Sequence, residues 1–219
     1  RVVLVALGHL SQLKGADVLL EALRRTPDPA RFQLHLAGAE VEPDYAARLR
    51  ELARGLDVHF HGAYRRAELE SHPATAAHAL VSGTRAAESW GLVVDEATQL
   101  GLPVVVPRSG AFVDRLAGEH YGLLYEPCDA DALARALWRL WSEPELLERL
   151  RAGIPAGGAA CASADEHVER TLEAYRDVLE LGAPAMPADE WWRERMLDAN
   201  ERAWDDALRR CDARALGLS

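Results

Sequence analysis

The sequence predicts an α/β fold in which helices cover both faces of a doubly wound parallel sheet. Short apolar strand patterns alternate along the chain with amphipathic helical patterns, as is typical of such a sheet. The run at 102–106, LPVVV, is wholly apolar and rich in β-branched residues, as expected of a strand buried on both faces. A chain of 219 residues is long enough to form a substantial core.

The predicted elements follow one another in a regular order. Strands are predicted at 2–7, 32–37, 58–60, 79–81, 102–106 and 122–125. Helices are predicted at 16–25, 44–56, 66–77, 92–100 and 129–141. Pro73 interrupts the third helix, whereas Gly101 and Pro103 end the fourth just before the central strand.

Composition excludes several classes of protein. The formal net charge of −10 argues against a nucleic-acid-binding surface, and no apolar run approaches the length of about 20 residues needed to cross a membrane. Cys128, Cys161 and Cys211 are odd in number and widely spaced, so we expect neither a disulfide framework nor a zinc site. These features fit a reduced, cytoplasmic setting. Because the chain opens at Arg1 without a methionine or a signal peptide, we interpret it as a piece of a longer protein.

The stretch at 85–107 carries a pair of carboxylates. Glu88 lies in a predicted loop and Glu96 on the second turn of the next predicted helix, so both can face the same cleft. Between them, free amides at the helix N-terminus favour an anion or sugar hydroxyls. The alternative is structural: Glu96 is a solvated residue on a helix face, and Glu88 favours a helix start through the helix dipole.

The loop after the first predicted strand carries Lys14, the only lysine in the chain. A loop that leaves a strand and enters a helix is where phosphates dock, and a lysine there supplies a compact positive charge. His9 lies in the same loop and could donate to a phosphate. Alternatively, Lys14 is an incidental surface residue. No GxGxxG follows the first strand, which weakens a dinucleotide-dehydrogenase interpretation.

The order of these motifs resembles a known family. In succession the chain carries GHLSQLKG, HLAGAE, VHFHGAY, ESWGLVVDEATQLGLPVVVP, GLLYEPCDADALARAL and HVERTLEAYRDVL. Over about residues 2–181 this set is similar to the C-terminal, donor-binding half of retaining GT-B glycosyltransferases of the group 1 type. The resemblance implies a Rossmann-like domain, one half of a GT-B fold, that binds a nucleotide sugar.

The resemblance also implies roles for individual residues. His9 and Lys14 correspond to the arginine and lysine that bind the donor diphosphate, His9 being a departure from the family's arginine. Glu88 corresponds to the catalytic-site glutamate that contacts the sugar, and Glu96 to the glutamate that binds the ribose. The remaining correspondences involve backbone: amides that contact sugar or phosphate at Gly91, Leu92 and Val93, and a base-binding segment at 61–64, which includes His61 and Gly62.

The implied activity is transfer of a sugar, with retention of configuration, from a nucleotide sugar to an acceptor. No metal or other cofactor is expected. The family's N-terminal, acceptor-binding domain is missing, so we expect this chain alone to transfer nothing. One alternative is a catalytically silent module that binds a nucleotide sugar or activates a partner, and a dehydrogenase ranks third. Arg85 could supply a further cation or be a surface charge, and it is not counted among the candidate residues.

Three other patterns have simpler explanations than a site. The Asp129-Ala130-Asp131 triplet looks like a DxD metal motif, but an aspartate N-cap of the helix that follows is the simpler interpretation. The alternating histidines at 59 and 61 face one side of a strand, where packing is favoured over a metal pair. Trp138 and Trp141 are predicted to lie in the core.

The sequence changes character near its end. We predict a nucleotide-sugar-binding domain at 1–182 and a helical extension at 183–219, because a proline-rich stretch precedes a charged helical pattern at 189–216. The tryptophans of this pattern favour contact with a protein partner, or packing back on its own domain. Its prominent acidic residues argue against an anionic membrane.

Overall fold

The computed structural model describes residues 1–72, 75–118, 120–155 and 164–181. The chain divides into two compact units. The described part of the first is the α/β domain within 1–155, and that of the second is helix α7 (Ala164–Leu181). The predicted boundary between residues 182 and 183 and the predicted helix at 189–216 lie outside the described residues, so both stay predictions.

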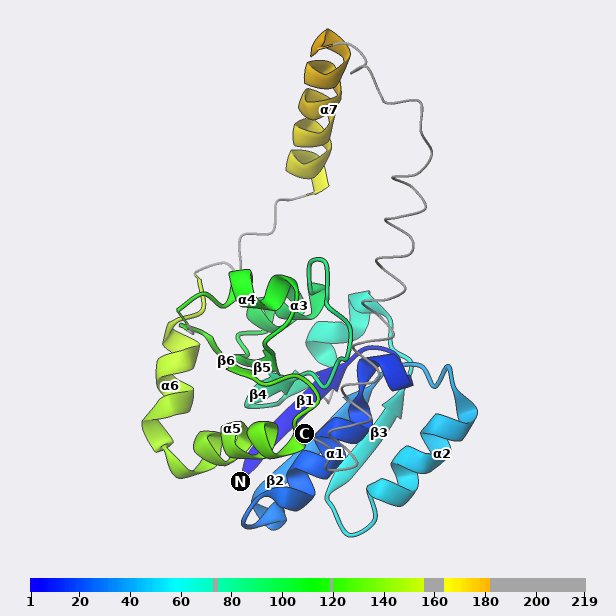
Figure 1. Cartoon of the computed structure of the whole chain (residues 1–219), viewed down its shortest axis with the longest axis vertical. Helices are drawn as coiled ribbons and strands as arrows, with labels where there is room; N and C mark the ends of the chain where they lie inside the picture. The colour runs from blue at the N-terminus through cyan, green and yellow to red at the C-terminus, as the bar shows by residue number, and fades with distance from the viewer. Residues whose placement is uncertain (73–74, 119, 156–163, 182–219) are drawn as a thin grey trace. The chain divides into compact units, whose positions relative to one another are not determined.

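A six-stranded sheet forms the centre of the α/β domain (Figure 1). Its strands lie in the order β3-β2-β1-β4-β5-β6, and every neighbouring pair is parallel. The strands are β1 (Val2–Leu7), β2 (Phe32–Ala37), β3 (Val58–Gly62), β4 (Ala79–Val81), β5 (Val104–Pro107) and β6 (Gly122–Tyr125). This order reverses direction beside β1, so the doubly wound Rossmann-like fold class predicted from the sequence is confirmed.

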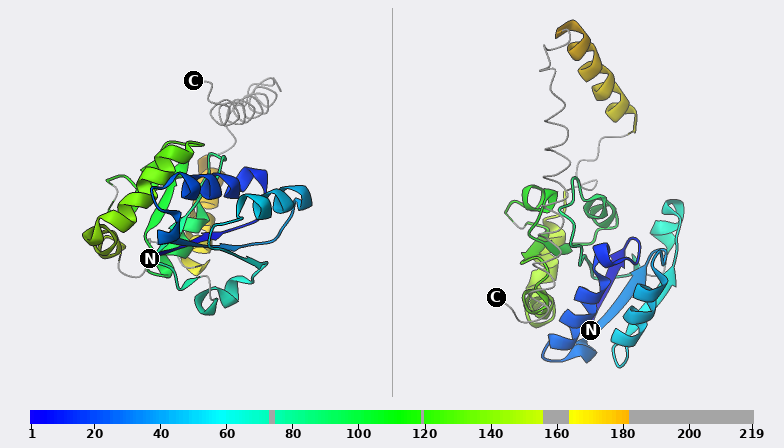
Figure 2. Two further views of the ribbon diagram at one scale, coloured as in Figure 1. Left: turned by 90° about the horizontal axis from the view of Figure 1, so that it is seen from below. Right: turned by 45° about the vertical axis from the view of Figure 1, so that its right-hand side comes forward.

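Helices cover both faces of the sheet, as the two views of Figure 2 show. One face packs against α1 (Ala16–Arg25), α2 (Pro43–Leu52), α5 (Ala130–Ser142) and α6 (Pro144–Ala152). The other packs against α3 (Leu92–Gln99) and α4 (Ala111–Arg115). Successive residues of one strand enter opposite cores, Leu4 the first and Val5 the second, and this explains why the strands read as continuous apolar runs.

The boundaries differ from prediction at a few places. The helix predicted at 66–77 is wrong beyond its first turns, because only a 3₁₀ helix, η3 (Arg66–Ser71), forms before Pro73. Helices α4, α6 and α7 were not among the predicted elements. The number and spacing of the cysteines indicated no disulfide framework, yet Cys128 is disulfide-bonded.

Two of the simpler explanations are confirmed. The Asp129 side chain accepts a hydrogen bond from the backbone N–H of Ala132, so it is the N-cap of α5. Trp138 and Trp141 pack against each other and against the first core, although both are only partly buried. Among the described residues, no helix combines the length and the apolar character required to cross a bilayer.

Candidate functional site

The site lies where the order of the strands reverses. In a doubly wound sheet, ligands bind outside the carboxyl ends of the strands at this switch point. Here β1 and β4 are neighbours in the middle of the sheet, and their connections run in opposite directions, to β2 and to β5. The loop at 8–15 follows β1 and the loop at 82–91 follows β4, so these two segments form the walls of the site.

The first loop presents Lys14 at the end of a short 3₁₀ helix, η1 (Gln12–Lys14). The Ser11 side chain caps this helix by accepting a hydrogen bond from the Lys14 backbone N–H, at 3.4 Å. Gly15 then adopts φ 62°, a left-handed conformation that glycine takes without strain, and α1 begins at the next residue. A tight turn between strand and helix therefore carries the only lysine of the chain.

The structure brings together two of the predicted site residues. The Lys14 Nζ atom lies 2.7 Å from Glu88 Oε1, although the two residues are 74 positions apart. The Thr84 hydroxyl, itself buried, lies 3.3 Å from the same carboxylate oxygen. Both charged side chains keep part of their surface in solvent, 41% for Lys14 and 22% for Glu88. A cation and a carboxylate thus lie together at one solvent-accessible part of the switch point, which we call the corner of the site.

The second loop holds Glu88 through its backbone. The Glu88 carbonyl oxygen accepts a hydrogen bond from the Ala111 N–H at 2.8 Å, at the start of α4. Gly110 packs so closely here that a Cβ atom on it would lie 2.5 Å from that carbonyl oxygen. Nearer β4, the buried Tyr125 hydroxyl donates to the Ser82 carbonyl oxygen at 2.7 Å, and burial raises the pKa of this phenol. The Glu88 backbone is therefore fixed by neighbouring strands and turns.

The predicted helix N-terminus also forms. Gly91 is the N-cap of α3 with φ 74°, and no side chain caps the first turn of this helix. The amides of the predicted segment Gly91, Leu92 and Val93 therefore lie at a helix start whose dipole favours an anion. Gly91 is required for packing as well, because a Cβ atom there would lie 2.5 Å from the ring of Phe112.

A buried ion pair behind this helix start was not predicted from the sequence. Asp95 accepts hydrogen bonds from the Trp90 indole N–H at 2.8 Å and from Arg115 Nη1 at 3.0 Å. Arg115 also donates to the carbonyl oxygens of Trp90 and Gly91, and its guanidinium lies 5.2 Å from the centre of the Trp90 ring. The pair therefore fixes an exposed tryptophan and the turn that begins α3.

The other predicted residues lie on neighbouring elements. Glu96 is on the second turn of α3 and is partly buried, and His9 is exposed in the first loop. His61 and Gly62 end β3, where the Gly62 carbonyl oxygen accepts from the Gly38 N–H at 2.8 Å. The ligand roles assigned to these residues stay predictions.

Histidines form a stack on one side of β2 and β3, as their alternation on the strand predicts. The His35 ring lies 4.9 Å from the His59 ring and 5.0 Å from the His61 ring, and His72 contacts His61 edge-on. His35 Nδ1 and His61 Nε2 are 2.7 Å apart, so one of these nitrogens donates and the other accepts. Within the described ranges, no group of three His, Cys, Asp or Glu side chains is arranged to hold a metal ion.

This stack predicts that acid destabilises the domain. Burial lowers the pKa of His35 and of His61 below the ordinary 6.5, and neighbouring histidines lower both further. The unfolded chain therefore takes up protons first, so this stability is complete above about pH 6.5 and is lost as the pH falls through the histidine range. We expect the melting temperature to decrease between about pH 7.5 and 5.5, and to decrease less in His35→Asn.

Calorimetric melting at both pH values checks this expectation. His120→Asn, which changes an exposed histidine outside the stack, is the control and should keep the wild-type decrease. An equal decrease in His35→Asn and in the control would show that the stack does not carry the pH dependence.

Together, the strand order and the position of the site at the switch point define a Rossmann-like architecture of the GT-B type. The model of the family described as "Glycosyl transferases group 1" matches residues 1–143. The chain belongs to this family.

Individual relatives agree with this assignment. The chain is 34% identical over 157 residues to a GDP-mannose-dependent alpha-(1-6)-phosphatidylinositol monomannoside mannosyltransferase of Mycolicibacterium smegmatis, an alignment that covers 66% of this chain and 40% of the relative. It is 31% identical over 180 residues to a D-inositol 3-phosphate glycosyltransferase of Xylanimonas cellulosilytica, covering 75% and 41%. The chain thus spans about two fifths of the length of these relatives.

The fold matches solved structures over a similar range. The crystal structure of Anabaena HepE in complex with UDP and glucose superposes with a TM-score of 0.71 at 22% identity, covering 81% of this chain and 49% of HepE. At this identity the similarity shows the fold, which is the one predicted from the order of the motifs.

Proposed function

We propose that this chain is the donor-binding half of a glycosyltransferase and that it binds a nucleotide-diphosphate sugar at the β1–β4 switch point. The observation that carries the proposal is the contact of 2.7 Å between Lys14 and Glu88, because it joins the residue assigned to the diphosphate with the residue assigned to the sugar. The related mannosyltransferase is named for GDP-mannose, and HepE was solved with UDP and glucose. These names support a nucleotide sugar as the ligand class.

The chemistry of the corner fits such a ligand. An ammonium group carries three N–H donors, so Lys14 can hold Glu88 and still donate to a phosphate oxygen. The amides at the start of α3 add partial positive charge without requiring a metal ion. Glu88 is an acceptor for sugar hydroxyls, and its contact with Lys14 supports a binding mode in which the sugar lies next to the diphosphate.

The transfer reaction is part of the proposal. We assign to the complete protein transfer with retention of configuration, in which an N-terminal half supplies the acceptor site. The coverage of about two fifths of the curated relatives supports this division. The chain by itself is proposed to bind the donor and to transfer no sugar, which an assay of donor consumption with and without the remaining half tests.

Lys14→Ala is the direct test of donor binding. We expect it to weaken binding of a nucleoside diphosphate by about 1.5–3 kcal/mol, or roughly 10- to 150-fold in Kd, because it removes a charge-assisted contact. Titration calorimetry with UDP and GDP measures the change. Gln12→Ala alters an exposed side chain of the same 3₁₀ helix and should bind like the wild type. Equal affinity of Lys14→Ala and wild type would remove Lys14 from the site.

The two glutamates are expected to respond differently. Glu96→Gln keeps the volume but removes a charged acceptor from the ribose, so it should weaken nucleotide and nucleotide sugar alike, on the order of 1–2 kcal/mol. Glu88→Gln should weaken only the nucleotide sugar, since only that ligand carries the sugar ring. Four affinities, two variants against two ligands, decide between these roles. The same pattern of loss in both variants would show that the division of roles is wrong.

A further inference from the structure

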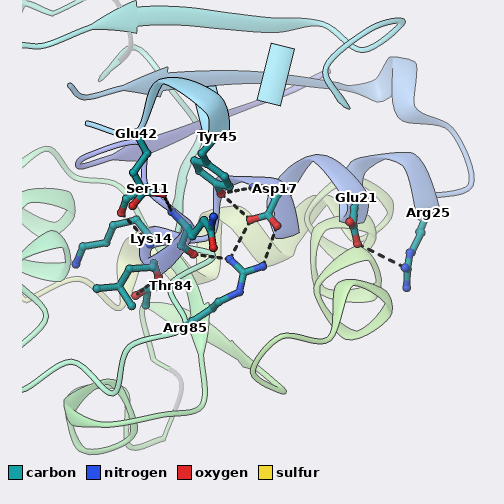
Figure 3. Close-up of polar contacts among 11 residues, drawn as sticks. Ser11, Lys14, Asp17, Glu21, Arg25, Glu42, Tyr45, Thr84 and Arg85 are labelled. Atoms are coloured by element: carbon teal, nitrogen blue, oxygen red, sulfur yellow. Dashed lines mark hydrogen bonds and ion pairs between the residues drawn. The ribbon is translucent and has the colours of Figure 1, made fainter. Parts of the chain in front are cut away.

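Arg85, which sequence reasoning left aside, joins the two loops of the site. Its Nη1 and Nη2 atoms donate to the two carboxylate oxygens of Asp17, at 2.9 and 2.8 Å, and Nη1 also donates to the Gln12 carbonyl oxygen at 2.6 Å (Figure 3). The Arg85 backbone N–H donates to the Leu13 carbonyl oxygen at 2.9 Å. One residue of the β4–α3 loop is therefore attached four times to the η1 turn and the start of α1.

Asp17 is in turn fixed by α2. The Tyr45 hydroxyl donates to Asp17 Oδ1 at 2.6 Å and accepts from the Asp17 backbone N–H at 3.1 Å (Figure 3). Burial alone would raise the pKa of Asp17, but the hydrogen bonds and the charge of Arg85 outweigh it and hold that pKa below its usual value. The carboxylate therefore stays charged at neutral pH, and the bidentate pair with Arg85 stays formed.

The backbones of the two loops also touch. A Cβ atom on Gly15 would lie 1.9 Å from the Gly83 carbonyl oxygen, and a Cβ atom on Gly83 would lie 2.1 Å from the Gly15 carbonyl oxygen. Lys14 directly precedes one of these glycines, and Glu88 follows Arg85 by three positions. The position of one loop against the other consequently sets the distance between the Lys14 ammonium and the Glu88 carboxylate.

The exposures of the two ion pairs indicate which one holds the other. Lys14 and Glu88 are 41% and 22% exposed, and a pair in contact with solvent contributes little free energy of its own. Arg85 and Asp17 are only 15% and 8% exposed, and the rigid guanidinium makes both of its hydrogen bonds in one plane. The solvated pair cannot fix its own geometry, whereas the buried pair can.

We propose that Arg85 is a positioning residue: through Asp17 it holds the Lys14 turn and the Glu88 loop in the register that brings Lys14 and Glu88 into contact. What this corner binds rests on the proposed function. The geometric role does not, because it concerns only groups of this chain.

The single lysine makes this role measurable without a ligand. In protein labelled with ¹⁵N and ¹³C only at lysine, one side-chain resonance reports on Lys14. Glu88→Gln removes the charged partner directly and so defines the resonance position of unpaired Lys14. We expect Arg85→Gln to move the signal most of the way from the wild-type position to that reference. Arg85→Lys is unsuitable because it adds a second lysine.

Arg115→Gln is the matched control. It breaks a similarly buried pair, with Arg115 and Asp95 at 13% and 2% exposure, and the hydrogen bonds of Arg115 to backbone are to the carbonyl oxygens of Trp90 and Gly91, which follow Glu88 in the loop. Its Lys14 signal should stay at the wild-type position. A wild-type signal in folded Arg85→Gln, or an equal displacement in Arg115→Gln, overturns the proposal.

Two further measurements complete the test. If Arg85→Gln does not fold, Tyr45→Phe removes both hydrogen bonds between the Tyr45 hydroxyl and Asp17 without adding an atom. A Lys14 resonance that moves part of the way from the wild-type position toward that of Glu88→Gln then supports the role of Arg85. A Lys14 resonance that stays at the wild-type position overturns it. Calorimetry with UDP and GDP should show about tenfold weaker binding by Arg85→Gln. A wild-type chain that binds neither nucleotide overturns the proposed function, whereas the lysine signal still decides the role of Arg85.

Discussion

Replacement of Asp95 by alanine is expected to lower the free energy of unfolding by about 3–5 kcal/mol, the range for removal of one partner of a buried ion pair. The Asp95 side chain is 2% exposed and that of Arg115 is 13% exposed, so the variant leaves a guanidinium without its carboxylate in a place that water hardly reaches. Arg115 would keep its hydrogen bonds to the carbonyl oxygens of Trp90 and Gly91, which carry no full negative charge. Urea denaturation followed by circular dichroism measures the loss.

Two further variants show whether the unpaired charge is the cause. Glu143→Ala breaks the exposed pair with Arg139 and should hardly change the midpoint of denaturation. The double variant Asp95→Ala/Arg115→Met removes both charges and should be more stable than Asp95→Ala alone. If the double variant loses as much free energy of unfolding as Asp95→Ala and Arg115→Met lose together when measured singly, the effect of Asp95→Ala does not come from the unpaired guanidinium.

Gly15→Ala should destabilise the domain by about 2–5 kcal/mol, combining strain of a left-handed backbone with a steric clash. Gly15 has φ 62°, and the new methyl group would lie 1.9 Å from the Gly83 carbonyl oxygen. Gly55→Ala separates these two contributions, because Gly55 has φ 77° but no atom within 4 Å of the position of a Cβ atom.

The control, Gly55→Ala, carries only the backbone strain, so its free energy of unfolding should fall by about 1–2 kcal/mol. The difference between the free energies of unfolding of Gly15→Ala and Gly55→Ala, determined by urea denaturation, measures the cost of separating the two loops of the site. Equal losses would mean that the loops separate at little cost, and the close approach would then not be a constraint on the site.

The sequence predicted the sheet well because its signal is local. The strand at 2–7 and the helix at 16–25 have the predicted bounds, since strand alternation and helical periodicity are each visible within one segment. Lys14 and Glu88 could be selected as candidates because each lies in a loop at the end of a predicted strand. Their contact across 74 positions follows from the order of the strands, which no single segment contains.

The ion pairs that brace the site could not be predicted in the same way. Arg85 looks like any surface arginine in a chain with this many arginines, and its partner Asp17 lies 68 positions away, on helix α1. Asp95 reads as an acidic residue suited to the first turn of a helix, although its carboxylate faces inward to Arg115. Sequence patterns distinguish apolar from polar positions, but the burial of a charged group depends on the tertiary fold.

The loop that carries Glu88 is anchored along its length, and this bears on the entropy of binding. It is tied at Ser82 to Tyr125, at Arg85 to Leu13 and at Glu88 to Ala111. Ordering a free backbone opposes binding by about 1–2 kcal/mol for each residue fixed, so a disordered loop of this length would consume much of the interaction energy of a small ligand. In this domain that ordering is completed when the chain folds. The cost of ordering this loop therefore does not reduce the affinity that contacts at the switch point provide.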